Sequence, residues 1–149
     1  MTRPLTTHQK IAAVYAAGFF VITLLDFLPG VKDDRGYLFG LFHLDPIDDV
    51  VHGLSFLWAA LAAWRSERAS IRYFRLFGAY YTADAILGLL TGWAVPELLV
   101  NWSIAPNYNP ADVLGNLPPN VPHFILGPAA LAFGFLLKPL RSSPEPART

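Results

Sequence analysis

The stretch that decides the fold is His43–Trp64, HLDPIDDVVHGLSFLWAALAAW, which begins with acidic and imidazole side chains and continues without a charge. Its Asp45-Pro46 pair predicts a helix start, because aspartate caps helix N-termini and proline suits the first helical position. The apolar residues that follow approach the roughly 20 residues that a helix needs to cross a bilayer core. The stretch therefore predicts a membrane-spanning helix over residues 47–64 with polar side chains at its start.

Three further stretches have the same apolar character and predict helices over residues 11–28, 73–95 and 121–137. Hydrophobic residues make up 54% of the 149 residues and charged residues 15%, whereas soluble domains contain about 25% charged residues. The first stretch has no small-x-small cleavage site behind it, so we expect it to remain as a span. We therefore predict an all-α fold, an integral membrane four-helix bundle in a single domain, with a disordered tail at 141–149.

The basic residues are distributed unevenly between the two ends of the predicted bundle. Nine of the eleven would lie at the end that carries both termini. These nine are Arg3, Lys10, Arg65, Arg68, Arg72, Arg75, Lys138, Arg141 and Arg148. Since the cytoplasmic loops of membrane proteins are enriched in lysine and arginine, we expect both termini to be cytoplasmic. The connections over 29–46 and 96–120 would then face outward and form a polar outer cap.

The two outer connections differ in content. Residues 36–44, GYLFGLFHL, are apolar but too short to span a bilayer, so we expect them to lie in the outer interface or to fold back over the bundle. Residues 96–120 are rich in asparagine and proline and contain no basic residue. A long loop of this kind is usually functional or disordered, and its Trp102 and Tyr108 favour an ordered cap at the interface.

Polar residues gather at the start of the span that follows Pro46. Asp48 and Asp49 lie one turn before His52, and residues three and four apart share a helix face. Acids in a first turn also favour the helix dipole, which explains them without a functional role. His52 is harder to explain in this way, because an unpaired polar group inside an apolar helix is costly. His123 opens the last span, which runs parallel to this one, at a matching depth.

These side chains predict a metal site, with two alternatives. Imidazole and carboxylate ligands suit zinc or another divalent ion. The candidate ligands are His52, His123, Asp48, Asp49 and Asp112, and Asn116, Asn120 and His43 could close over the ion. In the first alternative the two histidines form a hydrogen-bonded pair between helices and have only a structural role. In the second they are the axial ligands of a haem, which the nearby aspartates disfavour because they fit a hard or borderline ion better.

Asp84 falls near the middle of its predicted span. A charged group at that depth is expensive and is by default a functional residue with a partner. No basic residue lies at the same depth on any predicted span. Asp84 is therefore either protonated or hydrogen-bonded, and both a proton relay and a neutral structural acid remain open. The hydrogen-bond candidates are Tyr80, Tyr81, Thr82 and Thr23, and Asp26 could join the outer cluster from the first span.

Small residues are concentrated on the second and fourth predicted spans. Both spans contain the run Ala-Ala-Leu-Ala. The second also contains Gly53, and the fourth contains Gly127 and Gly134. Small residues let helix backbones approach closely in membranes. We therefore expect these two spans to make close helix–helix contacts.

Two segments resemble a known family. LFGLFHLDPIDDVVHGLSFL, residues 38–57, together with NPADVLGNLPPNVPHFILG, residues 109–127, resembles the small bacterial four-span integral membrane proteins classed only as a domain of unknown function. The resemblance implies a four-span topology in a bacterial cytoplasmic (inner) membrane. The matching positions are Asp49, His52, Asp112 and His123. The sequence departs from the family pattern in having an aspartate pair where an asparagine is expected, and in a Leu-Pro-Pro insert before the second histidine.

Composition narrows the function classes further. The chain contains no cysteine, which excludes cysteine-based metal sites, and its net charge of zero argues against a nucleic-acid partner. The leading hypothesis is a small polytopic membrane protein whose outward-facing His/Asp cluster binds a divalent metal. As an enzyme it would carry out metal-assisted hydrolysis with an aspartate as base.

Two hypotheses of other classes stand beside the metal site. One is a non-catalytic accessory or structural subunit of a larger membrane complex, in which the histidines only tie spans together. The other is a transporter or proton channel that uses Asp84. The expected partners are membrane lipids and either further copies of the chain or a larger membrane complex.

Overall fold

The computed structural model describes residues 4–34, 37–39, 42–43, 46–92, 94–96 and 112–139. Within these residues it contains four long helices and one short pair of strands. The helices are α1 (Thr7–Asp26), α2 (Pro46–Arg65), α3 (Glu67–Thr91) and α5 (Leu117–Phe135), and the strands are β1 (Tyr37–Leu38) and β2 (Phe42–His43). The predicted tail, and the part of the predicted outer cap between 97 and 111, lie outside the described residues.

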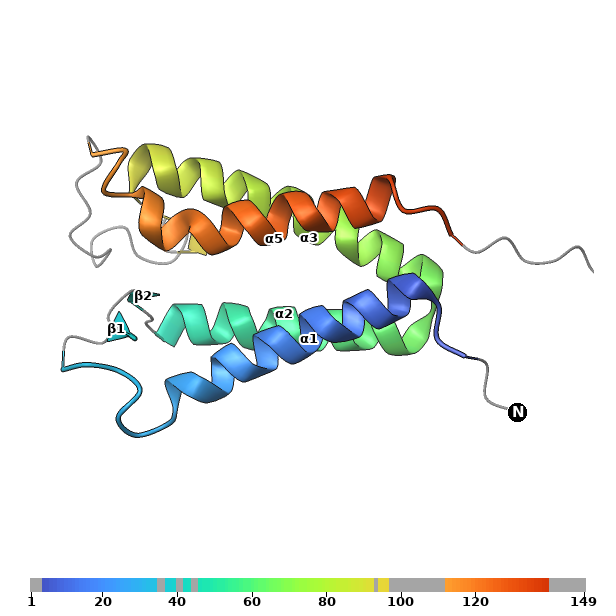
Figure 1. Ribbon diagram of the computed structural model, residues 1–149, viewed down its shortest axis with the longest axis horizontal. Helices are drawn as coiled ribbons and strands as arrows, with labels where there is room; N and C mark the ends of the chain where they lie inside the picture. Colours follow the sequence, from blue (N-terminus) through green and yellow to red (C-terminus); the bar gives the residue numbers. More distant parts are fainter. Residues whose placement is uncertain are drawn as a thin grey trace, which may run out of the picture.

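The four helices form two antiparallel hairpins (Figure 1). α1 packs along α2, and α3 packs along α5, whereas contacts between the two hairpins are fewer. A single residue, Ser66, joins α2 to α3. The start of α1 and the end of α5 lie at one end of the bundle, here called the terminal end, and β1 and β2 lie at the other, the strand end. The predicted arrangement of four helices is therefore confirmed.

Capping residues that the apolar runs did not mark set the ends of α1 and α3. Thr6 begins α1 in a capping box with Gln9. The hydroxyl of Ser66 accepts a hydrogen bond from the N–H of Ala69 at 3.1 Å and begins α3, well before the predicted start at 73. Gly92 ends α3 in the left-handed region, with φ 75°. Because caps satisfy the free backbone groups of a helix end, they set its bounds more closely than hydropathy does.

A short strand pair was not part of the all-α prediction. Tyr37 pairs with His43, and Leu38 with Phe42, in antiparallel register. Phe39 follows β1 with a positive φ of 54°. Residues 36–44 were expected to lie in the interface or to fold back over the bundle. Their described part forms a short strand pair. A ladder of two residues is too short to produce a recognisable period in the sequence.

A cluster of aromatic rings joins the two hairpins. Tyr15 of α1 lies edge-on to three rings of α3, with ring centroids 5.5–6.3 Å apart. These rings are Tyr73, Phe74 and Phe77, each at most 1% exposed. The Tyr15 hydroxyl donates to the carbonyl oxygen of Leu126 on α5 at 3.0 Å. Since edge-to-face pairs add about 0.5–1.5 kcal/mol beyond their burial, this cluster stabilises the contact between the hairpins.

Glycines bring α3 and α5 close together. A Cβ atom added to Gly78 would lie 2.7 Å from the backbone nitrogen of Leu131, and one added to Gly127 would lie 2.7 Å from the backbone nitrogen of Thr82. The expected close approach is thus confirmed for Gly127 on the last helix. It is wrong for Gly53 on α2, where an added Cβ would meet nothing within 4 Å.

The surface and the interior of the bundle differ from those of most soluble domains. Large apolar side chains are exposed on every long helix, for example Val14, Trp64, Leu76 and Ile125. Among the residues that the structure describes, the buried polar ones are His8, Ser55, Ser70, Asp84, Asn116 and Asn120. An exposed apolar surface and a partly polar interior are each uncommon in a soluble monomer. Together they indicate that the surface of the bundle contacts lipid or another protein.

Among the described residues, α1 is the one helix that is long and apolar enough to cross a membrane by length and composition. A core helix of a soluble protein or a signal sequence passes the same test, so this finding alone is weak support for a membrane protein. The four-helix fold is therefore established, and its membrane location is a proposal.

Candidate functional site

The strand-end half of the bundle contains a buried carboxylate–imidazole pair. Asp84 of α3 is 3% exposed, and its Oδ2 lies 3.3 Å from Nδ1 of His123 on α5. This contact is at ion-pair distance when the imidazole is protonated, but it is not aligned as a hydrogen bond. The other carboxylate oxygen, Oδ1, accepts a hydrogen bond from the N–H of Val95 at 2.7 Å. Asp84 therefore holds both α5 and the segment that follows α3.

The two candidate histidines pack against aromatic rings that touch each other. His123 lies edge-on to Tyr81, with centroids 4.7 Å apart, and His52 stacks on Phe19 at 5.9 Å. Phe19 and Tyr81 are 5.8 Å apart. The Nδ1 atoms of both imidazoles are buried and make no hydrogen bond. In the described structure no hydrogen bond joins the two rings, so the expected hydrogen-bonded histidine pair is replaced by two aromatic contacts.

The predicted carboxylate ligands lie in separate places. Asp48 and Asp49 occupy the first turn of α2, where acids favour the helix dipole. Asp112 is exposed, and its Oδ1 accepts a hydrogen bond from the N–H of Gly115 at 2.8 Å, so it supports the turn before α5. Over the described ranges, no group of three or more His, Cys, Asp or Glu side chains is placed to hold a metal ion. The side chain of His43 lies outside the described residues.

Two buried asparagines, expected to close over an ion, bind the backbone instead. The Asn116 side chain donates to the carbonyl oxygen of Leu89 at 3.1 Å. The Asn120 side chain donates to the carbonyl oxygen of Asn116 at 2.8 Å. An added Cβ at Gly88 of α3 would collide with the Asn120 amide. These contacts tie the start of α5 to the end of α3, beside the Asp84–His123 pair.

Asp26 forms an ion pair with Lys32, in the turn that follows α1, and it also lies close enough to His52 of α2 for their charges to interact, as expected. A second carboxylate–imidazole pair, which the sequence did not reveal, lies at the terminal end and joins His8 to Glu67. His8 is fully buried, and its Nδ1 lies 3.0 Å from Oε1 of Glu67. Gln9, the next residue, donates to the carbonyl oxygen of Ala63 at 2.8 Å. The start of α1 is thus bound to the α2–α3 connection.

The Asp84–His123 contact could have been found by counting from the hairpin connection. Asp84 stands seven residues before the end of α3 at Thr91, and His123 stands six residues after the start of α5 at Leu117. In an antiparallel hairpin, residues at similar distances from the connection lie level. The predicted span began at residue 121, which placed His123 at the membrane surface and hid this pairing.

Fold and site together define an α-helical protein of two packed hairpins with a carboxylate–imidazole pair in its interior. The chain belongs to the family described as Domain of unknown function (DUF4383), whose model matches residues 9–136. The match confirms the resemblance to a family classed as a domain of unknown function. No curated protein and no solved structure matches the chain.

Proposed function

We propose that the protein is a four-span integral membrane protein with both termini in the cytoplasm, and that it acts as a non-catalytic structural or accessory bundle. The observation that carries this proposal is the position of large apolar side chains on the outside of all four helices. Examples are Phe20 and Leu24 on α1, Leu57 and Leu61 on α2, Leu76 and Leu90 on α3, and Ile125 and Phe135 on α5. An apolar surface of this extent needs a lipid or protein environment.

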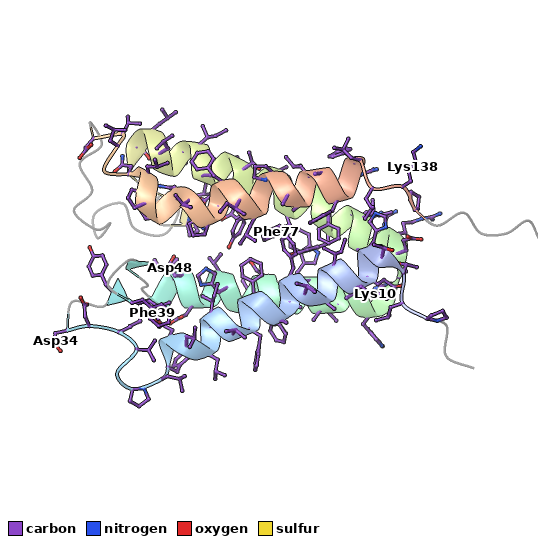
Figure 2. All side chains as sticks on the ribbon, viewed as in Figure 1. Lys10, Asp34, Phe39, Asp48, Phe77 and Lys138 are labelled. Atoms are coloured by element: carbon purple, nitrogen blue, oxygen red, sulfur yellow. The ribbon has the colours of Figure 1, made fainter. Side chains whose placement is uncertain are left out.

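The charges along the bundle support the orientation. Lys10 and Lys138 lie at the terminal end, and Asp34 and Asp48 lie at the strand end (Figure 2). Cytoplasmic segments of membrane proteins are enriched in lysine and arginine. With the terminal end in the cytoplasm, the strand end and the acids at the start of α2 would face outward.

Polar contacts between the helices support a structural role. Several of them join one helix to another through a backbone carbonyl oxygen. The Arg75 Nε donates to Gly134 at 2.8 Å, and the Ser70 hydroxyl donates to Ala62 at 3.1 Å. Tyr15 does the same across the two hairpins. Side chains that bind neighbouring helices in this way hold membrane bundles together. Their polar atoms are therefore used in contacts between helices rather than in a reaction.

Labelling of single cysteines tests the topology, because the chain has no cysteine of its own. We expect Asp34→Cys, exposed at the strand end, to react with a membrane-impermeant maleimide on intact bacteria that produce the protein. Arg68→Cys, exposed at the terminal end, should react only after the cells are permeabilised. The cysteine-free parent is the control. Equal labelling of both variants in a soluble fraction would refute the membrane location.

Divalent metal binding is the second candidate, because the Nδ1 atoms of His52 and His123 are buried without a hydrogen bond and a carboxylate lies beside one of them. Zinc binds imidazole nitrogen and carboxylate oxygen at about 2.0–2.2 Å. The proposed structural role predicts that protein purified without a metal column contains only traces of divalent metal and no haem absorption. His52→Ala and His123→Ala should then lower thermal stability without changing the metal content.

Elemental analysis and a visible absorption spectrum of this purified protein test that expectation, and they can overturn the non-catalytic role. Near one equivalent of zinc or another ion, lost in both histidine variants, would establish the metal site and favour metal-assisted chemistry at the outer membrane surface. A Soret band lost in both variants would instead establish a haem with histidine ligands. Ser55→Ala, also on α2 but without an imidazole, is the matched control for a general loss of folding.

A further inference from the structure

An open apolar groove of about 520 Å³ lies between α1 and α2. Alanines from both helices form its floor, and Ala16 and Ala63 among them are each 6% exposed. Larger residues form its walls, including Phe20 at 49% and Trp64 at 81% exposure. Ligand pockets usually measure about 300–1,000 Å³, so the groove is large enough for a small apolar ligand.

The groove ends near the middle of the bundle. Phe20 of α1 and Phe56 of α2 both line it, and their rings touch across the two helices with centroids 5.3 Å apart. Leu5 and Trp64 line it at the terminal end. From Phe56 to Trp64 the helix rises about 12 Å, close to half of a hydrocarbon core of about 30 Å. The groove therefore extends over roughly one leaflet.

This length decides between two kinds of occupant. A transmembrane helix of a partner would run through the whole thickness of the bilayer, and the Phe20–Phe56 contact stands in its path. A single acyl chain ends near the bilayer centre, as the groove does. Small alanines between larger side chains leave an open apolar groove of this length. The geometry therefore favours a lipid chain over a second helix.

The charges at the open end favour an anionic headgroup. Lys10, Arg65 and Arg68 are exposed at the terminal end, where Lys10 is labelled in Figure 2. Lys10 lies three residues before groove residue Ala13 and so shares its side of α1. The acid that the described residues place at this end, Glu67, is engaged with His8. A basic rim beside an apolar groove is complementary to an anionic amphiphile.

We propose that the groove binds one acyl chain of an anionic phospholipid of the cytoplasmic leaflet, with Lys10 at its headgroup. This inference rests on the proposed membrane location and orientation. It assigns the bundle a specific lipid rather than the general solvation that any membrane helix receives.

Native mass spectrometry of the full chain tests the lipid, after reconstitution in vesicles of equal phosphatidylglycerol and phosphatidylcholine. We expect one retained phosphatidylglycerol per chain, in preference to phosphatidylcholine. Ala17→Leu, which fills the groove from an exposed position, should raise the dissociation constant about tenfold, a difference of about 1.4 kcal/mol, and so lower the retained fraction. Gly18→Leu, beside it but facing open space, is the matched control and should retain the lipid.

The headgroup is tested by a pair of charge variants. Lys10→Gln should remove the preference for phosphatidylglycerol, whereas Lys138→Gln, an equal change at the same end of the bundle, should keep it. Equal lipid retention by Ala17→Leu and Gly18→Leu would overturn the proposal, and so would a wild-type chain without headgroup preference. A dimer that Ala17→Leu abolishes would assign the groove to a second copy instead.

Failure of this proposal is distinguishable from failure of the proposed function. Cysteine labelling with the expected topology, combined with no specific lipid, would refute the lipid site alone. Labelling that places the chain outside the membrane would refute both.

Discussion

Asp84→Ala is expected to lower the free energy of unfolding by about 1–3 kcal/mol, because it leaves buried polar atoms without a partner. The N–H of Val95 would lose its acceptor, and the imidazole of His123 would lose the carboxylate 3.3 Å away. Asp84 is 3% exposed, so water cannot replace either contact without a change in packing. Detergent-solubilised protein, unfolded by heat and followed by circular dichroism, provides the measurement.

Two further variants separate the contacts of Asp84. Asp84→Asn keeps a carbonyl oxygen for Val95 but removes the charge beside His123, so we expect an intermediate loss. Asp84→Ala combined with His123→Ala should cost less than the sum of the two single changes, because both remove the same contact. The exposed Asp34 is the control, since surface substitutions usually change stability by less than about 0.5 kcal/mol. A cost for Asp84→Ala no larger than for Asp34→Ala would contradict the buried pair.

Gly78→Ala is expected to cost about 1–3 kcal/mol through overpacking of α3 against α5. The added Cβ would lie 2.7 Å from the backbone nitrogen of Leu131 and 2.9 Å from the carbonyl oxygen of Gly127. Both atoms belong to the backbone of α5, so a side-chain rotation cannot relieve the contact. The two helices would have to separate, which would also strain the Asp84–His123 contact between them. The same thermal unfolding experiment measures this loss.

Gly53→Ala is the matched control for the glycine prediction. Gly53 lies within α2, and an added Cβ would meet nothing within 4 Å. Alanine is a better helix former than glycine by about 1 kcal/mol, so this variant should be neutral or more stable. Equal stability of Gly78→Ala and Gly53→Ala would show that α3 and α5 lie further apart than the structure has them.

The number and order of the helices could be predicted from the sequence because apolar runs are local. Each run between Ile11 and Leu137 extends over many consecutive residues, so a few polar positions do not hide it. The helix ends were less predictable, because single caps such as Ser66 and Gly92 decide them. The two-residue strands were missed since they have no period to detect.

The candidate site could be predicted only in part. His52, His123 and Asp84 were each recognised as polar residues in apolar surroundings, which a sequence shows directly. Their partners were not, because a partner depends on the register of helices distant in the chain. Asp112 was expected near the histidines and instead supports its own turn through Gly115. The prediction of a metal site remains open to the elemental analysis described above.

By itself, the sequence determined a chain of four helices with most of its basic residues at one end of the bundle. These are properties of consecutive residues, and local propensity and hydropathy suffice to establish them. Only the tertiary structure decided that His123 meets Asp84 and that His52 stacks on Phe19. It did so because glycine contacts set the spacing of α3 and α5, and aromatic rings set the packing of the hairpins. Those contacts form between residues far apart in the chain, so no single stretch of sequence encodes them.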